Sequence, residues 1–269
     1  MDKTKIDWCD STWNPVTGCL HNCEYCYARN IAKRFGGWSW VVDNDVDTLH
    51  DTVLKCDSPI RELDEPLEIL NDNGTVRKAP YPYDFIPTFH RYKLDKYANK
   101  KGRNIFVCSM ADLFGEWVPE EWIIEVFEAC KKGTQHNYIF LTKNPKRYIE
   151  LCQKGLLPQE DNFWFGSSET KSTDHYSWFT DQKFHWFLSM EPLLEEFGEI
   201  NPGAAKPEWV IIGSETGNRK GKVIPRRAWI ESLVDQCRLY GIPVFMKDSL
   251  TDIWGTGLIR EFPQQLLHG

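Results

Sequence analysis

The second half of the chain repeats one pattern of apolar and polar positions. From Asn104 onward, short β-branched or aromatic runs end in polar clusters and are followed by stretches with helical spacing. This alternation predicts a series of βα units. The runs predicted as strands are residues 104–108, 138–141, 163–165, 185–188, 209–212 and 243–246.

Helices are predicted between these runs, with residues that begin and end a helix in the expected places. Pro119 precedes Glu120 and Glu121, as suits a first turn, and Gly241 follows the last helical stretch. The predicted helices are residues 119–132, 145–154 and 225–240, with an earlier one at 27–35.

The alternation also predicts the fold class. Nearly continuous apolar strands between helices indicate a parallel sheet with helices on its outer face. We favour an α/β fold with a partial or closed (β/α) barrel over an open doubly wound sheet, because polar residues follow the strand ends, where barrel active sites lie. One domain over residues 1–269 is predicted, with an insertion at 41–83, where acidic and turn-rich residues break the pattern.

The composition excludes several classes of protein. Hydrophobic residues make up 41% and charged residues 26% of the 269, which argues against disorder. No apolar run approaches the roughly 18 residues of a membrane span, and the first residues show no secretion signal. We therefore predict a cytoplasmic protein that does not enter a membrane.

The charge balance limits nucleic-acid binding to a local patch. With 32 basic and 39 acidic residues, the net charge is −7, so the bulk of the surface repels a phosphate backbone. One loop carries five cations within nine residues and predicts either nucleic-acid contact or a solvated loop. These cations are Arg219, Lys220, Lys222, Arg226 and Arg227.

Three of the nine cysteines are clustered, and the clustering predicts a metal site. Cys19, Cys23 and Cys26 have the spacing Cys-x3-Cys-x2-Cys, with Tyr25 placed to cover one side of a bound group. Three thiolates leave one metal position open, as in an iron–sulfur cluster with a non-protein ligand. The alternative is a zinc-stabilised nucleic-acid-binding module in which Cys9 or His21 supplies the fourth ligand. Buried core positions are predicted for the scattered Cys56, Cys108, Cys130, Cys152 and Cys237.

The cysteine loop resembles a known signature. The segment from Gly18 to Tyr27 is similar to the cysteine motif of the radical S-adenosylmethionine (SAM) superfamily, whose members have partial or full βα barrels. Further segments resemble a largely uncharacterised, often phage-associated branch of that superfamily, and together the similar regions span residues 5–35 and 85–263. These segments are residues 13–19, 106–114, 141–145, 189–194 and 212–217.

The resemblance implies an activity and its cofactors. It implies a [4Fe-4S] cluster held by Cys19, Cys23 and Cys26, with SAM chelating the fourth iron. An external donor such as flavodoxin or ferredoxin would supply one electron, and SAM cleavage would yield methionine and a 5′-deoxyadenosyl radical that abstracts hydrogen from an unidentified substrate.

Polar residues at the strand ends are the candidates for binding SAM. We expect Ser109 and Asp112 at its ammonium group, Lys143 at its carboxylate, and Ser167 or Ser168 at its ribose. Spore photoproduct lyase is similar in placing Ser-x-x-Asp and Thr-Lys segments on successive strands. The alternative for each residue is a helix cap or a loop ion pair.

Three further strand-end residues are predicted to face the substrate. Glu191, Glu215 and Lys247 follow later strands and are the catalytic candidates. They could equally form a structural ion pair, or the two carboxylates could act as the acid and base of a barrel hydrolase.

Overall fold

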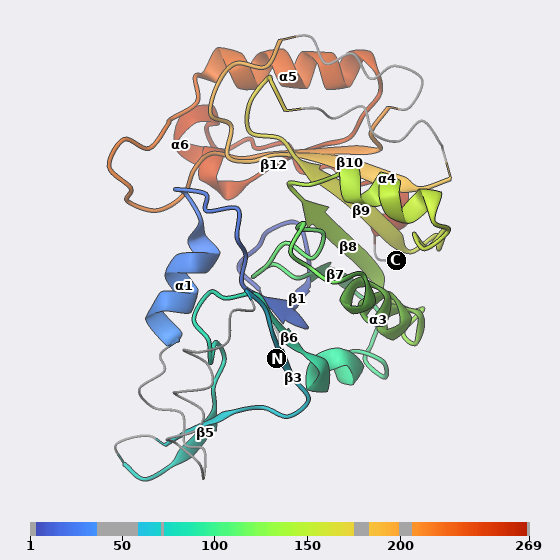
Figure 1. The fold of residues 1–269 in the computed structure, drawn as a ribbon. Coiled ribbons are helices and arrows are strands. Elements are labelled where there is room, and N and C mark those ends of the chain that lie inside the picture. Colours follow the sequence, from blue (N-terminus) through green and yellow to red (C-terminus); the bar gives the residue numbers. More distant parts are fainter. Residues whose placement is uncertain (1–3, 37–58, 71–72, 175–182, 199–205, 268–269) are drawn as a thin grey trace. The chain divides into compact units, whose positions relative to one another are not determined.

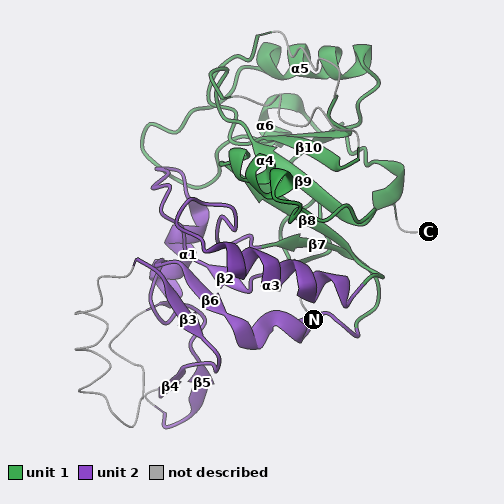
Figure 2. Ribbon diagram, turned by 45° about the vertical axis from the view of Figure 1, so that its right-hand side comes forward, with its two compact units in different colours: residues 1–12, 100–107, 134–269 green, residues 13–99, 108–133 purple. Residues whose placement is uncertain are grey.

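The computed structural model describes residues 4–36, 59–70, 73–174, 183–198 and 206–267. The chain divides into two compact units (Figure 2). Unit 1 comprises residues 1–12, 100–107 and 134–269, and unit 2 comprises residues 13–99 and 108–133. Each unit is described by itself below.

Unit 1 is built around a seven-stranded sheet that curls into a half-barrel (Figure 1). The strand order is β1-β7-β8-β9-β10-β11-β12, and the successive pairs from β7 to β12 are parallel. The strands are Ser11–Trp13 (β1), Asn104–Val107 (β7), Asn137–Thr142 (β8), Phe163–Ser168 (β9), His185–Met190 (β10), Trp209–Ile212 (β11) and Val244–Met246 (β12).

Both faces of this sheet are apolar, which explains why its strands read as continuous hydrophobic runs. Successive side chains point to opposite faces, so Trp164 joins a core cluster on one face while Phe165 packs against Tyr148 of a helix on the other. The cluster consists of Trp8, Phe106, Ile139, Trp164, Phe187, Trp209, Ile211, Phe245 and Leu266.

Helices α4 (Lys146–Gln153) and α5 (Arg227–Leu239) belong to unit 1 (Figure 2). The buried side of α5 is formed by Ile230, Leu233, Val234 and Cys237, with the spacing of an amphipathic helix. Three short elements complete the unit: Asp248–Leu250 (η3), α6 (Thr251–Trp254) and Gln264–Leu266 (η4).

Unit 2 combines small sheets with two helices. Its three-stranded sheet has the order β2-β6-β3, and β4 pairs with β5 as an antiparallel hairpin. Phe89 of β6 stacks on Trp122 of α3 with ring centroids 5.2 Å apart. The elements are β2 (Val16–Thr17), α1 (Tyr27–Phe35), β3 (Arg61–Leu63), β4 (Glu68–Leu70), β5 (Val76–Lys78), β6 (Thr88–His90), η2 (Arg91–Lys96) and α3 (Glu120–Lys131).

The predicted βα pattern is confirmed. Every predicted strand and helix has a counterpart in the structure, and the curled sheet fits a partial barrel rather than an open sheet. Strand β1 was not predicted, because three residues are too few to show a period. Cys56 and parts of the predicted insertion, residues 41–58 and 71–72, lie outside the described residues, and its described remainder contains β3, β4 and β5. A single domain over residues 1–269 stays a prediction.

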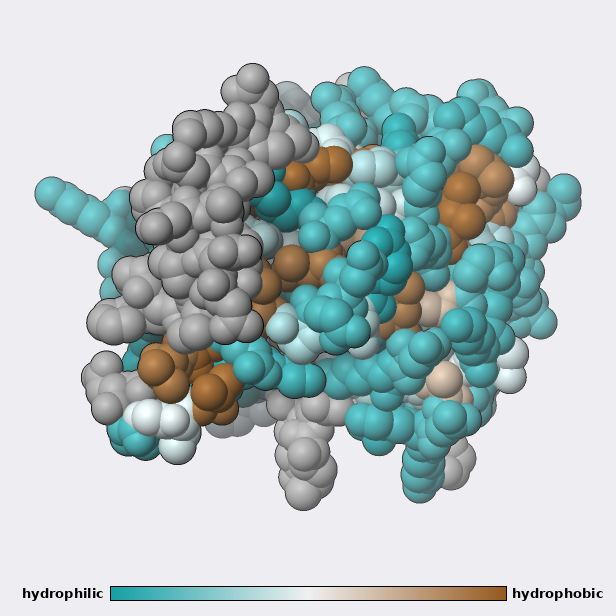
Figure 3. Space-filling model, turned by 60° about the horizontal axis from the view of Figure 1, so that its bottom comes forward, coloured by the Kyte–Doolittle hydropathy of each residue, from teal (hydrophilic) through white to brown (hydrophobic). Residues whose placement is uncertain are grey.

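On the face that Figure 3 presents, the described residues are mostly hydrophilic, with apolar areas between them. Within the described part of the chain, no helix has the length and apolar character needed to cross a membrane.

Candidate functional site

The cysteine loop of unit 2 is fixed to its surroundings by its backbone. Gly18 has φ +84°, and a Cβ at this position would lie 2.3 Å from the carbonyl oxygen of Ile86, so only glycine fits. The N–H of Gly18 donates to the Met110 carbonyl (2.9 Å), and the N–H of Cys19 donates to the Phe85 carbonyl (3.2 Å). These contacts set where the loop begins.

The last cysteine of the loop caps helix α1. The N–H of Arg29 donates to Cys26 Sγ at 3.3 Å, and the N–H of Cys26 donates to the Cys23 carbonyl at 3.2 Å. The Cys26 sulfur therefore lies at the N-terminus of α1, close to its backbone N–H groups. Cys19, Cys23 and Cys26 are all partly exposed. Burial first, and then the neighbouring Asp112, Cys23 and Cys26, raise the pKa of Cys19 to about 12, which indicates that these acidic groups lie close together.

Asp112 contacts the cysteine loop through His21. His21 Nε2 lies 2.7 Å from Asp112 Oδ2, and its ring meets Trp117 edge-on, with centroids 4.8 Å apart. The other carboxylate oxygen accepts from the N–H of Phe114 at 3.0 Å. Asp112, which is only 6% exposed, is thus both a turn cap and a partner of the loop.

Ser109 and Tyr25 also belong to unit 2. The Ser109 hydroxyl donates to Asn14 Oδ1 (3.1 Å), and the Ser109 carbonyl accepts from the Tyr27 hydroxyl (2.7 Å). Tyr25 is half-buried next to Cys26. Unit 2 therefore contains the three cysteines, Tyr25, Ser109 and Asp112 together. Sequence reasoning missed Asn14, whose half-buried side-chain oxygen accepts from the Ser109 hydroxyl and from the N–H of Met110.

The arrangement of the thiols bears on the kind of metal site they could form. Among the described residues, no group of three or more His, Cys, Asp or Glu side chains is arranged to hold one metal ion. Ligands of one zinc lie about 2.3 Å from it, whereas each cysteine of a four-iron cluster binds a different iron, so its thiols stand further apart. Two buried N–H groups of the same unit, Arg29 Nε and Trp117 Nε1, have no hydrogen-bond partner in the structure. By the chemistry of its donors alone, a set of three thiols in one loop suits a cluster that takes one further ligand.

A second group of polar residues lies along the C-terminal ends of the strands in unit 1. Lys143 Nζ donates to Ser168 Oγ at 3.0 Å, and Ser168 Oγ donates to the Glu191 carbonyl at 3.4 Å. Glu191 forms an ion pair with Lys247. A Cβ added to Gly213 would lie 3.1 Å from side-chain atoms of both Glu191 and Lys247, so this glycine leaves room for the pair.

This row follows five neighbouring strands and lies on the inner face of the half-barrel. Ser168 is four residues after Trp164, and Lys247 is two residues after Phe245. Because residues an even number apart in a strand point to the same face, Ser168 and Lys247 lie on the face of the core cluster. The predicted residues Lys143, Ser168, Glu191 and Lys247 are thus brought together.

Ser167 and Glu215 lie outside this row. Ser167 donates to Glu169 Oε1 at 2.5 Å, and Glu169 is 1% exposed, a buried acid that sequence reasoning did not select. Its only sequence signal was its place in the polar cluster after β9. Ser167 therefore points to the face opposite Ser168, as adjacent strand residues do.

Glu215 pairs with the basic loop instead. Arg219 donates twice to its carboxylate, at 2.7 and 2.8 Å, and this guanidinium holds the pKa of Glu215 below its usual range. Arg227 pairs with Glu231 at 2.8 Å, so two of the five predicted cations are offset by carboxylates. Glu191 and Glu215 thus each pair with a cation, Lys247 and Arg219, rather than with each other.

Cys9 belongs to unit 1 and packs beside the core cluster. Its Sγ lies 3.9 Å from the Ile6 carbonyl, and burial raises its pKa to about 12. Cys9 therefore lies in the environment of a core thiol, beside Ile6 and the core cluster of unit 1.

Comparison with known proteins identifies the family but not an activity. A family model described as a protein of unknown function (DUF5131) matches residues 3–256. The chain belongs to the DUF5131 family. No curated protein and no solved structure matches the chain. The matched region of this DUF5131 chain contains every site residue named above.

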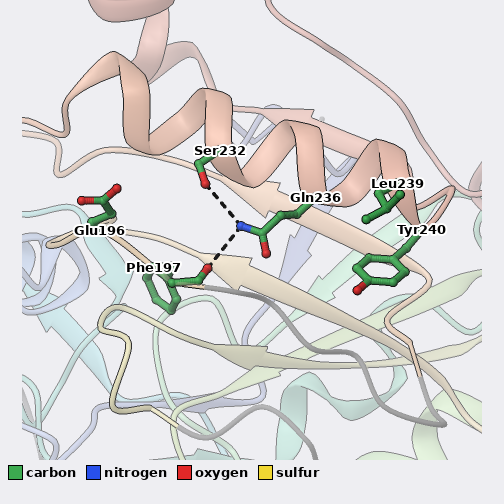
Figure 4. Close-up of a pocket in the computed structure, with 7 residues that line it drawn as sticks. Glu196, Phe197, Ser232, Gln236, Leu239 and Tyr240 are labelled. Carbon is green, nitrogen blue, oxygen red and sulfur yellow. Dashed lines mark hydrogen bonds between the residues drawn. The ribbon is translucent and has the colours of Figure 1, made fainter.

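A hollow of about 580 Å³ on unit 1 of this DUF5131 member is shown in Figure 4. Gln236 of α5 crosses it, donating to the Gly198 carbonyl (3.2 Å) and to Ser232 Oγ (3.3 Å). It contains none of the predicted site residues and offers one carboxylate, Glu196, as its charged group.

Proposed function

We propose that the chain is a radical SAM enzyme. The observation that carries the proposal is the cysteine loop: three partly exposed thiols within eight residues, the last of them at the N-terminus of α1. Three sulfur donors suit a cluster that keeps one iron open for a further ligand. We infer that Cys19, Cys23 and Cys26 hold a [4Fe-4S] cluster.

The cofactors supply the difficult chemistry. When bound, the cluster passes one electron from an external donor into the sulfonium of SAM, breaking a C–S bond to give methionine and a 5′-deoxyadenosyl radical. The protein binds and orients SAM and excludes water from the radical. We propose a ferredoxin or flavodoxin as the donor and a cytoplasmic location, where the thiols stay reduced.

Several side chains are proposed to bind SAM. In unit 2, Asp112 is buried and hydrogen-bonded to His21, which positions its carboxylate as an ammonium acceptor, and Ser109 lies beside Tyr27. In unit 1, Lys143 is proposed to bind the carboxylate of SAM and Ser168 its ribose, because the two already contact each other. Ser167, which donates to buried Glu169, is the weaker ribose candidate.

The substrate is proposed to lie against Glu191 and Lys247. This pair stands on the inner face of the half-barrel, beside Gly213, where a hydrogen-bonding substrate can reach both charges. Glu215 is proposed to act indirectly, by holding Arg219. Contact of the basic loop with nucleic acid would then rest on Lys220, Lys222 and Arg226, the three loop cations with no ion pair among the described residues.

Replacing the cysteines tests the metal site. Anaerobic reconstitution with iron and sulfide should load about four irons per wild-type chain, and Cys19→Ala, Cys23→Ala or Cys26→Ala should each lose that iron, because two thiolates do not hold a cubane. Cys9→Ala is the matched control and should keep full iron. One zinc per chain, lost on changing Cys9 or His21, would instead establish the zinc-stabilised module.

A further inference from the structure

The cysteine loop and α1 carry an unusual share of exposed apolar surface. Of the nine large apolar side chains exposed among the described residues, four lie within residues 20–35: Leu20, Tyr27, Ile31 and Phe35, which are 45%, 45%, 36% and 50% exposed. The last three are spaced four apart on one helix and therefore form one stripe. Ala28 and Ala32 are the buried residues of the same helix.

The same helix is positively charged. Its sequence contains Arg29, Lys33 and Arg34 and no acidic residue, in a chain whose net charge is −7. Lys33 and Arg34 are exposed, and the described carboxylates form no ion pair with either. Arg34 lies over the Phe35 ring at 5.4 Å, which places a cation at the end of the apolar stripe.

This surface begins at the thiols. Leu20 lies between Cys19 and Cys23, and Tyr27 directly follows Cys26, the cap of the helix. The Tyr27 hydroxyl is held by the Ser109 carbonyl at 2.7 Å, so the start of the stripe is fixed in place. Any protein that covers the stripe therefore comes close to the sulfur atoms.

We propose that Leu20, Tyr27, Ile31, Phe35, Lys33 and Arg34, here called the α1 surface, form the docking site for an acidic electron-transfer protein of the ferredoxin or flavodoxin type. The inference rests on the proposed function. One electron leaves the reduced donor, which is oxidised, and enters the cluster held by the three cysteines, which is reduced; no bond forms or breaks in this step.

The composition of the α1 surface suits such a partner. Electron-transfer complexes are small and transient, so a short apolar stripe is sufficient contact area. Opposite charges raise the association rate of such complexes and make it fall with salt. A basic helix on an otherwise acidic protein directs an acidic partner to this one place.

Charge reversal on α1 tests the proposal in the reconstituted full-length protein. The probe is a reduced acidic ferredoxin, and the readout is the second-order rate of cluster reduction at low ionic strength. Lys33→Glu/Arg34→Glu should lower this rate about 10-fold or more and remove its salt dependence. Reduction by dithionite, a small molecule that needs no docking site, should be unchanged.

The matched control is Lys100→Glu/Lys101→Glu, which changes the net charge equally at another exposed pair. It should keep the wild-type rate. If Lys33→Glu/Arg34→Glu reduces iron loading, the charge-neutralising variant Lys33→Gln/Arg34→Gln is used in its place. It should also lower the rate at which ferredoxin reduces the cluster. Equal ferredoxin rates in the α1 and control variants, with normal dithionite reduction, would overturn the docking site and leave the radical SAM proposal intact. A wild-type protein that binds no iron would overturn both.

Discussion

Lys143 shows how one side chain can have either a structural or a ligand-binding role. It is partly buried and donates to Ser168, so it already ties the end of β8 to β9. If it also binds the carboxylate of SAM, Lys143→Ala should weaken SAM binding about 10- to 100-fold, because a lost charge-assisted hydrogen bond costs about 1.5–3 kcal/mol. Equilibrium binding to the reconstituted protein measures the effect.

Ser168→Ala is the comparison for Lys143→Ala: it removes the hydroxyl that contacts Lys143 and is proposed to bind the ribose, and it keeps the ammonium. This variant should bind SAM more tightly than Lys143→Ala does. Unchanged SAM affinity in Lys143→Ala, together with a lower melting temperature, would assign Lys143 to structure alone.

His90 provides a pH-dependent test of the core of unit 2. Its ring is fully buried, 2.9 Å from Thr17 Oγ1 and 3.2 Å from the Tyr92 hydroxyl. Burial first, and then the charge of Lys93, lower its pKa from 6.5 to about 3. The folded protein therefore keeps His90 neutral, while the unfolded chain takes up a proton below pH 6.5. Stability from this group is complete above pH 6.5 and declines as the pH falls toward 3.

The free energy of unfolding should thus fall by up to about 1.4 kcal/mol per pH unit between pH 6 and 4 through His90. Denaturant unfolding across this range measures the slope for the wild type and for His90→Gln. The variant should show a flatter dependence than the wild type. Identical slopes for the wild type and His90→Gln would mean that His90 takes up its proton over the same pH range in the folded protein as in the unfolded chain.

Individual contacts were less predictable than residue positions. Lys143, Ser168, Glu191 and Lys247 could be selected from the sequence because polar residues at strand C-termini meet at one edge of a parallel sheet. The pairing of Glu215 with Arg219, rather than with the Glu191 row, could not, since it depends on how the loop after β11 turns back. The side chains of Ser167 and Ser168 point to opposite faces of the sheet because β9 continues to Ser168, and the sequence did not show where this strand ends.

At the scale of elements, long periodic segments were predicted well and short ones were not. Strands β7 to β12 and helices α3, α4 and α5 contain regularly spaced apolar residues, and Pro or Gly marks where the helices begin or end. The three-residue strands of unit 2, such as β3 and β5, are partly or fully exposed and carry no period. Their pairing is set by tertiary contacts that sequence patterns do not record.

The pairing of β9 with β10 depends on a missing side chain. Gly166 is the register partner of Phe187, and a Cβ at Gly166 would lie 2.3 Å from the Phe187 ring. Gly166→Ala should therefore destabilise the protein by about 1–3 kcal/mol, because an aromatic ring in a packed core cannot move aside without strain. Thermal or denaturant unfolding measures the loss.

Two further variants make this test specific. Gly166→Ala/Phe187→Leu should recover part of the stability, since the smaller partner leaves room for the methyl group and the two changes are then not additive. Gly257→Ala, where no atom lies within 4 Å of an added Cβ, should be nearly neutral. Equal effects at Gly166 and Gly257 would contradict the packing.

For the whole molecule, the architecture and the chemistry are supported to different degrees. The half-barrel is seen directly in the strand order of the seven-stranded sheet. The family is shown by a family model that matches residues 3–256. The activity rests on the cysteine loop, whose spacing could be read from the sequence, while its anchoring by Gly18, Ile86 and Met110 needed the structure.

SAM cleavage tests the central claim most directly. The reconstituted protein is incubated anaerobically with SAM and dithionite, and 5′-deoxyadenosine and methionine are quantified by mass spectrometry. The wild type should produce both in equal amounts, even without substrate, and Cys23→Ala should produce neither. If a wild-type protein loaded with about four irons forms no 5′-deoxyadenosine, or if Cys23→Ala forms as much as the wild type, the chain is not a radical SAM enzyme.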